Sequence, residues 1–226
     1  MRDNKRFKIS AILFDLDGTL IDTIGDLTLV CNQVLGELGR PLLDKATVQS
    51  YLGDGVRELM KRCLGGMPDE GEFTRAMTIF NQCYGDANGQ DAAVYPGVFE
   101  ALEHACSMGL RLACVTNKAT QFTLPLLEQK KLAPFFAVTV CGDTLATRKP
   151  EPEMLWYACD LLSTPPGGAL MVGDSRNDVQ AAKAAGMPVL LLRDGYHGAV
   201  AVDSMDAAGL ISDLTGVFDY IEPAVD

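Results

Sequence analysis

The chain has 226 residues, of which 48% are hydrophobic and 22% are charged, so it can form a buried core and lacks the composition of a disordered protein. Its formal net charge of -11 argues against a large surface for binding nucleic acid. The longest apolar runs are too short to span a bilayer, so no membrane partner is expected.

Cysteine usage and the first residues bear on the cellular compartment. The seven cysteines are an odd number without a C-x-x-C pair, which predicts buried free thiols rather than disulfides or a zinc site. The first residues, M-R-D-N-K-R, are not followed by the apolar stretch of a signal peptide. We therefore expect a cytoplasmic protein, and the sequence leaves both a monomer and a homodimer open.

The N-terminal part of the chain contains an apolar run followed by aspartates. The run at residues 9–14 predicts a buried strand that delivers Asp15 and Asp17 before Gly18 breaks the pattern. A parallel sheet places functional side chains where its strands end, so these aspartates should lie at a ligand crevice. Two carboxylates at one strand end repel each other unless a cation joins them.

The next segment has a helical pattern without a convincing strand. Thr23 and Asp26 stand at the spacing of a capping box. The helices are predicted over residues 24–38, 56–64 and 69–86. We therefore predict that residues 22–93 form a small α-helical cap, inserted after the first strand.

From residue 94 onward, helices and strands alternate. The predicted strands cover residues 110–115, 136–141, 169–172 and 189–192. The predicted helices begin at about residue 98 and then cover residues 120–129, 151–162 and 177–185. This alternation predicts an α/β protein with a doubly wound parallel sheet, whose core comprises residues 1–21 and 94–226. Short helices are expected to complete the fold after residue 203.

Polar residues follow the predicted strands at 110–115, 136–141 and 169–172. They include a hydroxyl, an amide, two ammonium groups and further carboxylates: Thr116, Asn117, Lys118, Lys149, Asp174 and Asp178. Because the carboxyl ends of parallel strands lie at one edge of a sheet, these side chains should converge with the first aspartates on one site.

The converging residue types suit a metal ion and a phosphoryl group. The carboxylates of Asp15 and Asp174, with the backbone carbonyl of Asp17, are hard oxygen ligands of the kind that Mg²⁺ prefers. Thr116 and Lys149 can donate hydrogen bonds to phosphoryl oxygens, which would leave Asp15 placed for in-line attack.

Four motifs carry a resemblance to a known family. D-L-D-G-T at 15–19, T-N-K at 116–118, K-P at 149–150 and G-D-S-R-N-D at 173–178 resemble the ordered motifs of the haloacid dehalogenase-like superfamily. The helical insertion is similar to the cap of that superfamily. Longer stretches, L-G-D-G-V-R-E-L-M, V-T-N-K-A-T-Q-F and G-D-S-R-N-D-V-Q-A-A-K-A-A-G, resemble bacterial phosphoglycolate phosphatases.

That resemblance implies a Mg²⁺-dependent phosphatase of a small phosphorylated metabolite, with 2-phosphoglycolate as the expected substrate. Asp15 would be the nucleophile and would form an aspartyl-phosphate. Asp17 would protonate the leaving oxygen and then activate water. Asp15, the Asp17 carbonyl and Asp174 would bind the metal directly. Asp178 would not bind it but would orient the water molecules on the metal.

Several residues keep two interpretations each. Asn117 either contacts substrate or caps the helix that follows it, and Asp178 taken alone could also be a helix cap. Lys118 is expected to be a solvated surface lysine rather than a substrate contact. Arg57 either binds a substrate carboxylate bidentately or is a solvated helix residue.

Other functions are compatible with the same core. A sugar phosphomutase would use the same aspartyl-phosphate and transfer it to a sugar hydroxyl. Another small phosphate, such as a nucleoside monophosphate, a sugar phosphate or pyrophosphate, could replace 2-phosphoglycolate. Asp17 counts against a dehalogenase, which needs no acid for its leaving halide. A binding module without catalysis is disfavoured because every expected catalytic position is filled.

Overall fold

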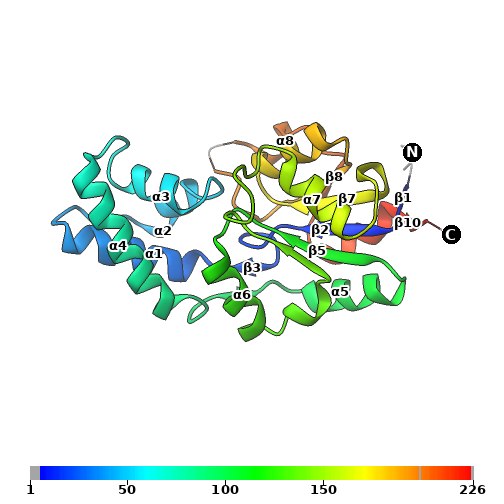
Figure 1. Ribbon diagram of the computed structural model, residues 1–226, viewed down its shortest axis with the longest axis horizontal. Coiled ribbons are helices and arrows are strands. Elements are labelled where there is room, and N and C mark those ends of the chain that lie inside the picture. Colours follow the sequence, from blue (N-terminus) through cyan, green and yellow to red (C-terminus); the bar gives the residue numbers. More distant parts are fainter. Residues whose placement is uncertain (1–5, 199, 225–226) are drawn as a thin grey trace.

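The computed structural model describes residues 6–198 and 200–224. Residues 1–5 and 225–226 of the predicted core, and residue 199 within it, lie outside the described residues. The molecule has an elongated shape, with a sheet-containing core at one end and a group of helices at the other (Figure 1).

The largest sheet among the described residues has six strands in the order β6-β5-β2-β7-β8-β9. Every pairing in it is parallel. The strands are β2 (Ala11–Phe14), β5 (Arg111–Val115), β6 (Val138–Val140), β7 (Ala169–Gly173), β8 (Val189–Leu192) and β9 (Gly209–Ile211). The chain builds outward from β2 in both directions, which confirms the predicted doubly wound α/β fold.

Helices cover both faces of this sheet. Successive strand residues point to opposite faces, so Ile12 packs with one cluster of apolar side chains and Leu13 with the other. Helices α5 (Val98–Ser107) and α6 (Thr120–Gln129) contribute to the Ile12 cluster. Helices α7 (Glu153–Leu161) and α8 (Arg176–Ala185) contribute to the Leu13 cluster. Because both faces are covered, the central strands β2, β7 and β8 are apolar throughout rather than alternating.

The ends of the described chain differ from the prediction. The expected short helices after residue 203 are joined by two strands, β9 at the sheet edge and β10 (Ile221–Pro223). β10 pairs in parallel with β1 (Phe7–Ile9), which lies before Ser10 and outside the six-stranded sheet. Strands of three residues are too short for a sequence period to reveal, and their partners lie far away along the chain.

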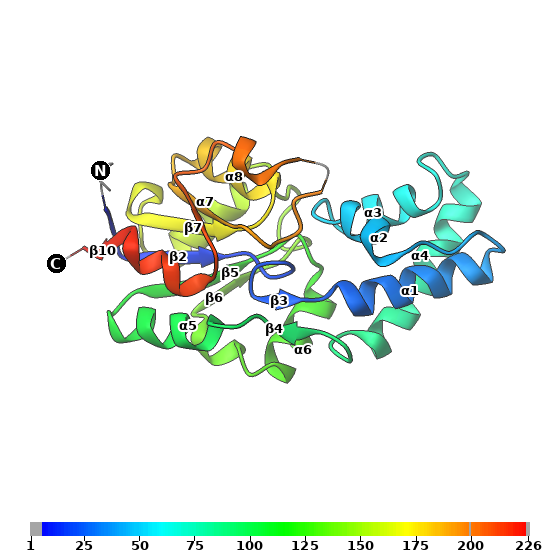
Figure 2. The ribbon, with the colours of Figure 1, turned by 180° about the vertical axis from the view of Figure 1, so that it is seen from behind.

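Four helices follow the short strand β3 (Ile21–Asp22), and the chain returns through β4 (Ala93–Val94), which pairs antiparallel with β3 (Figure 2). We call these helices the helical lobe: α1 (Ile24–Glu37), α2 (Lys45–Ser50), α3 (Val56–Cys63) and α4 (Glu70–Ala87). They pack around an apolar cluster that includes Val30, Val34, Met60 and Phe80, and that Phe122 of α6 joins from outside the lobe. The division into a core and a cap at residues 22 and 93 stays a prediction, and the β3–β4 pair lies beside both proposed boundaries.

The predicted capping box at the start of α1 is wrong. Thr23 makes no side-chain cap, because its hydroxyl instead donates to Asp17 Oδ1 over 2.8 Å. Asp26 is buried and accepts hydrogen bonds from the backbone N–H groups of Gly89 and Asp91, each at 2.7 Å. Both residues therefore make contacts distant in sequence, which spacing alone does not show.

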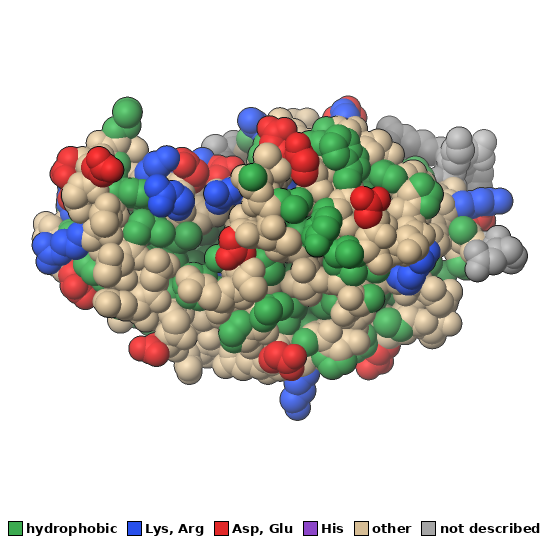
Figure 3. All heavy atoms as spheres, in the orientation of Figure 1, with side chains coloured by type: hydrophobic (Ala, Val, Ile, Leu, Met, Phe, Trp, Pro, Cys, Tyr) green, Lys and Arg blue, Asp and Glu red, His purple; other side chains and the backbone are tan. Residues whose placement is uncertain are grey.

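Two further expectations concern cysteines and membranes. The seven cysteines are free, but Cys106 is exposed and Cys83 is only partly buried, so the prediction that all are buried is wrong for these two. Within residues 6–198 and 200–224, no helix is both long and apolar enough to cross a membrane. On the face shown in Figure 3, basic and acidic side chains are interspersed over the helical lobe.

Candidate active site

Asp15 and Lys149 form the centre of the site. Asp15 follows β2 directly, and Lys149 Nζ lies 2.9 Å from its Oδ1 and 2.7 Å from Asp178 Oδ1. The same ammonium donates to the backbone carbonyl of Val115 over 2.7 Å. The Lys149 side chain is 2% exposed, so a buried cation lies between two carboxylates that come from different strand ends.

Asp174 lies in the short turn after β7, and Asp178 lies in the first turn of α8. Asp174 accepts a hydrogen bond from the Thr19 hydroxyl at 2.9 Å. Asp178 Oδ2 accepts from the backbone N–H of Ser175 at 3.0 Å and from its hydroxyl at 2.7 Å, and these residues form a capping box for α8. Asp178 is thus a helix cap, as one interpretation predicted, and it also contacts Lys149. Both its oxygens have protein partners.

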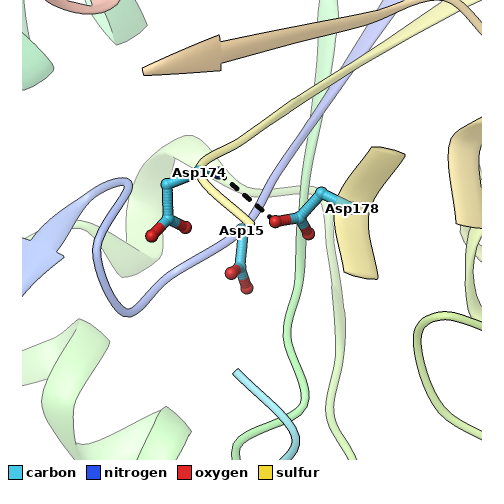
Figure 4. Close-up of side chains that lie close together, drawn as sticks. All are labelled: Asp15, Asp174 and Asp178. Atoms are coloured by element: carbon cyan, nitrogen blue, oxygen red, sulfur yellow. Dashed lines mark hydrogen bonds between the residues drawn. The ribbon is translucent and has the colours of Figure 1, made fainter. Parts of the chain in front are cut away.

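The three carboxylates could hold a metal ion. Oxygens of Asp15, Asp174 and Asp178 lie within 4.8 Å of one another, and their side chains converge from the end of β2, the turn after β7 and the first turn of α8 (Figure 4). Asp15 Oδ1 is buried and accepts no well-aligned hydrogen bond from the described residues, although Lys149 lies close to it. A buried carboxylate oxygen whose neighbouring cation is Lys149, with a second carboxylate beside it, suits a hard divalent cation.

The electrostatics of these carboxylates support the same conclusion. Burial raises the pKa of Asp15 to about 6, with Lys149 opposing the shift and the negative charge of Asp178 adding to it. Burial also raises the pKa of Asp174 well above its usual range, and the charges of Asp15 and Asp178 act in the same direction. The protein alone therefore leaves the negative charge of this cluster incompletely balanced.

Asp17 lies beside a lysine whose placement differs from the prediction. Lys118 Nζ is 3.2 Å from Asp17 Oδ1 and 3.3 Å from Oδ2, and it donates to the Tyr84 hydroxyl over 2.5 Å. The Lys118 side chain is 5% exposed, so the expectation of a solvated lysine is wrong. Tyr84 belongs to α4, and nothing in the sequence shows that this helix packs against the residues after β5.

The other residues after β5 also point to the site. Thr116 is buried and lines the same cavity as Asp15. Asn117 Nδ2 donates to the backbone carbonyls of Gly53 and Lys149, at 3.0 and 2.8 Å. The helix-capping interpretation of Asn117 is wrong, because α6 begins after Ala119. Asn117 instead joins a core loop to a loop of the helical lobe.

A cavity lies between the core and the helical lobe. Its core side is polar and includes Asp15, Asp17, Thr116, Lys118, Lys149 and Asp174. Its lobe side is apolar and includes Leu27, Leu52, Val56, Leu59, Phe80 and Tyr84. The sheet edge therefore supplies the charged groups, and the lobe supplies a surface that limits the size and polarity of a ligand.

Arg57 lies apart from these predicted site residues. It is exposed on α3, and its guanidinium carbon is 4.9 Å from the centre of the Phe73 ring. Its neighbours Gly55 and Val56 line the cavity, whereas Arg57 does not belong to the lining. The described arrangement favours the solvated interpretation, and a carboxylate-binding Arg57 stays a prediction.

Several contributing residues escaped the sequence analysis. Tyr196 donates its backbone N–H to Asp174, and its hydroxyl contacts the start of the helical lobe. Asn177 Nδ2 donates to the carbonyl of Gly53 over 3.0 Å, beside the bond from Asn117. Asn177 stands inside a recognised motif, so it could have been considered, whereas Tyr196 lies in a loop with no pattern of its own.

The fold and the site together define a class of protein. A doubly wound sheet, an acidic cluster at the carboxyl ends of its strands and a helical lobe over that edge describe an α/β enzyme with an aspartate-based site. Residues 12–192 match the family model of haloacid dehalogenase-like hydrolases. The chain belongs to this family.

Individual relatives extend the similarity over nearly the whole chain. A phosphoglycolate phosphatase of Nitrosospira multiformis is 43% identical over 210 residues, which cover 91% of this chain and 92% of that protein. Another, from Thiobacillus denitrificans, is 40% identical with the same coverage. The crystal structure of a predicted phosphoglycolate phosphatase from Haemophilus somnus matches with a TM-score of 0.88 and 30% identity, covering 93% of this chain and 96% of that one.

Proposed function

We propose that this hydrolase is a Mg²⁺-dependent phosphatase that converts 2-phosphoglycolate to glycolate and phosphate through an aspartyl-phosphate on Asp15. The observation that carries the proposal is the placement of Asp15, whose Oδ1 is buried beside Lys149 without a well-aligned hydrogen bond among the described residues. The names of the relatives from Nitrosospira multiformis and Thiobacillus denitrificans support the choice of substrate.

The metal would be held by the carboxylates of Asp15 and Asp174 and by the backbone carbonyl of Asp17. Bound Mg²⁺ would neutralise charge on the carboxylates and on the phosphoryl oxygens. Asp178 would not bind the metal directly, because its two oxygens already accept hydrogen bonds from Lys149 and from Ser175. It fixes the buried lysine and the turn that carries Asp174.

The chain's own residues account for both halves of the reaction. Asp15 attacks phosphorus, so a bond from its carboxylate oxygen to phosphorus forms as the bond from phosphorus to the ester oxygen breaks. Asp17 gives a proton to the departing oxygen. Water then attacks the aspartyl-phosphate and gives a proton to Asp17, which releases phosphate and restores both aspartates. Thr116 and Lys149 donate to the phosphoryl oxygens throughout.

The surroundings of Asp17 hold its carboxylate in place. The Thr23 hydroxyl and Lys118 both contact its carboxylate, so the carboxylate is held in one orientation. With substrate bound, the apolar side of the cavity would limit the access of bulk water to the reacting atoms. Small phosphomonoesters hydrolyse extremely slowly without a catalyst, so positioning and charge neutralisation must together lower a very large barrier.

A phosphate-release screen with Mg²⁺ tests the proposal. The screen compares 2-phosphoglycolate with a nucleoside monophosphate, a sugar phosphate and pyrophosphate, and it follows conversion between hexose phosphates as the signature of a phosphomutase. We expect the highest kcat/KM for 2-phosphoglycolate. Preferred conversion of a hexose phosphate, or no release from 2-phosphoglycolate, would overturn the assignment.

A further inference from the structure

Lys118 is a buried cation that makes no contact with substrate in the proposed reaction. It follows β5, its side chain is 5% exposed, and it lines the cavity next to Asp17. We propose that Lys118 binds the carboxylate of the substrate and thereby selects phosphomonoesters that carry a carboxylate next to the ester-bearing carbon. This inference rests on the proposed phosphatase function and adds the residue that distinguishes its substrate class.

The first argument concerns the distribution of positive charge. Among the described residues that line the cavity, the lysines and arginines are Lys118 and Lys149. Lys149 contacts Asp15 and Asp178 and lies at the phosphoryl end. Lys118 contacts Asp17, at the leaving-group end. A substrate with an anion at each end would therefore meet one lysine at each end.

The second argument concerns distance. A general acid must come within a hydrogen-bond length, about 3 Å, of the oxygen that it protonates. Lys118 Nζ is 3.2 Å from Asp17 Oδ1, so the ammonium also lies near the place that the departing oxygen must take. In 2-phosphoglycolate the carboxylate carbon is only two bonds from that oxygen. A carboxylate at this position is therefore within reach of Lys118, whereas the distal groups of longer phosphomonoesters are not.

The third argument concerns what surrounds the ammonium. Tyr84 accepts one of its hydrogen bonds, and the lysine Nζ also lies 4.7 Å from the centre of the Tyr84 ring. Phe122 packs against Tyr84 with ring centres 4.8 Å apart, which makes an aromatic wall. An ammonium has three N–H donors. One N–H shared between the two Asp17 oxygens, at 3.2 and 3.3 Å, and a second given to Tyr84 leave the third for an incoming acceptor. Beside this aromatic wall, a carboxylate of the substrate forms a stronger hydrogen bond with the third N–H of Lys118 than a neutral hydroxyl does.

A simpler role for Lys118 is to hold Asp17 in place. A residue with only that role affects every phosphomonoester alike, because the acid serves every leaving group. The two roles therefore predict different outcomes when the substrate's carboxylate is replaced by a neutral group of the same size. The suitable pair is 2-phosphoglycolate and 2-hydroxyethyl phosphate, which differ only in carboxylate against hydroxymethyl.

The experiment measures kcat and KM for both esters with the wild-type protein and with Lys118→Met, each in Mg²⁺. We expect the wild-type preference for 2-phosphoglycolate to fall by about 10- to 100-fold in the variant, mainly through KM, because a charge-assisted hydrogen bond is lost. The control is Lys61→Met on α3, whose ammonium pairs with Glu58 at a partly exposed site. Its preference should match that of the wild type.

A binding measurement covers the case in which Lys118→Met is inactive. Dissociation constants for both esters are measured by calorimetry in an Asp15→Asn background, with and without Lys118→Met, and Lys118→Gln replaces Met if the first variant does not fold. The proposal predicts weaker binding of 2-phosphoglycolate and little change for 2-hydroxyethyl phosphate.

The outcomes separate the inference from the function on which it rests. A wild-type protein that does not hydrolyse or does not prefer 2-phosphoglycolate overturns the proposed function, and the inference with it. A wild-type preference that survives unchanged in the Lys118 variants, with both esters weakened equally, leaves the phosphatase intact and overturns the role of Lys118 in specificity.

Discussion

The carboxyl-end edge of the sheet, where the loops after the strands lie, and the helical lobe contribute to the cavity in different ways. The edge gathers charged groups from short segments that each follow a strand, such as Asp15 after β2 and Asp174 after β7. The lobe contributes apolar side chains from helices that are packed on a core of their own, such as Leu59 of α3 and Phe80 of α4. The comparison shows that the charged groups are placed by the ends of the strands, whereas the apolar side of the cavity depends on packing between two parts of the molecule.

Lys118 belongs to both parts of this comparison. It is placed by β5 of the sheet, and its ammonium contacts Asp17 of the edge and Tyr84 of the lobe. It is therefore the position at which the reacting groups and the selecting surface meet. The substitutions and the metal addition described next test whether residues at the carboxyl ends of the strands control turnover and stability, while surface residues of the helical lobe do not.

The largest effect is expected at Asp15, the proposed nucleophile. Asp15→Asn removes the anionic oxygen that attacks phosphorus, so kcat should fall by about 10⁴-fold or more. The fold should remain, because asparagine has the same shape and removes a repulsive charge from the acidic cluster. Phosphate release and a thermal melt measure the two results. Asp206→Asn, at an exposed pair with Lys183, is the control and should behave as wild type. Activity of Asp15→Asn within tenfold of wild type would exclude Asp15 as the nucleophile.

A large effect on stability is expected at Lys149. Lys149→Met leaves Asp15 and Asp178 buried beside each other without their shared cation, and breaking such a buried pair costs about 3–5 kcal/mol. At about 2–4 °C per kcal/mol, Tm should fall by roughly 6–20 °C. Lys183→Met removes an exposed pair and should cost at most about 1 kcal/mol. Equal losses in both variants would contradict the buried role of Lys149.

The acidic cluster predicts a pH-dependent response to metal. The pKa of Asp15 is raised from 3.8 to about 6. Between these two pH values, the native protein therefore binds more protons than the unfolded chain. The free energy of unfolding of the metal-free protein should therefore fall as pH rises through this range, and the raised pKa of Asp174 adds to the trend.

Metal binding should offset this loss at neutral pH. At about 100 times its dissociation constant, Mg²⁺ should add about 2.7 kcal/mol at pH 7.5, which corresponds to a Tm increase of roughly 5–10 °C. The increase should shrink at pH 5, where protons compete for the same carboxylates. Thermal melts with Mg²⁺ and with EDTA at both pH values make the measurement. A Mg²⁺ effect that grows toward low pH would place the metal elsewhere.

The smallest effect is expected at Arg57. Its side chain is exposed over Phe73 and does not line the cavity, so Arg57→Ala should change KM for 2-phosphoglycolate by less than about twofold. Steady-state kinetics on this ester and on a neutral aryl phosphate measure the change. A selective rise in KM for 2-phosphoglycolate would restore Arg57 as a carboxylate-binding residue and would show that the lobe rearranges around substrate.

The sequence predicted the edge well for a physical reason. Strand ends of a parallel sheet converge, so Asp15, Lys149 and Asp174 could be brought together once the strands were located. Their neighbours on the chain also carry recognisable motifs. The edge strands β9 and β10 were missed because three residues give no usable period, and their partners are set by the folded sheet rather than by local spacing.

The lobe side of the site could not be predicted in the same way. Tyr84 reads as one more core residue of an amphipathic helix, and only the packing of α4 against α6 brings its hydroxyl to Lys118. A lysine next to a helix start is usually solvated, so the residue type and its position favoured the wrong interpretation of Lys118 as a surface lysine. Arg57 was proposed from its residue type, and its direction on α3 depends on the rotation of that helix.

The central claim is that phosphate passes through the carboxylate of Asp15. The direct measurement uses 2-phosphoglycolate labelled with ³²P, mixed with excess enzyme and Mg²⁺ and quenched in acid during a single turnover. The account predicts transient label on the peptide that contains Asp15, released by hydroxylamine as an acyl phosphate is, and absent from Asp15→Asn. Release of labelled phosphate without any label on the protein, or label on a different residue, would contradict it.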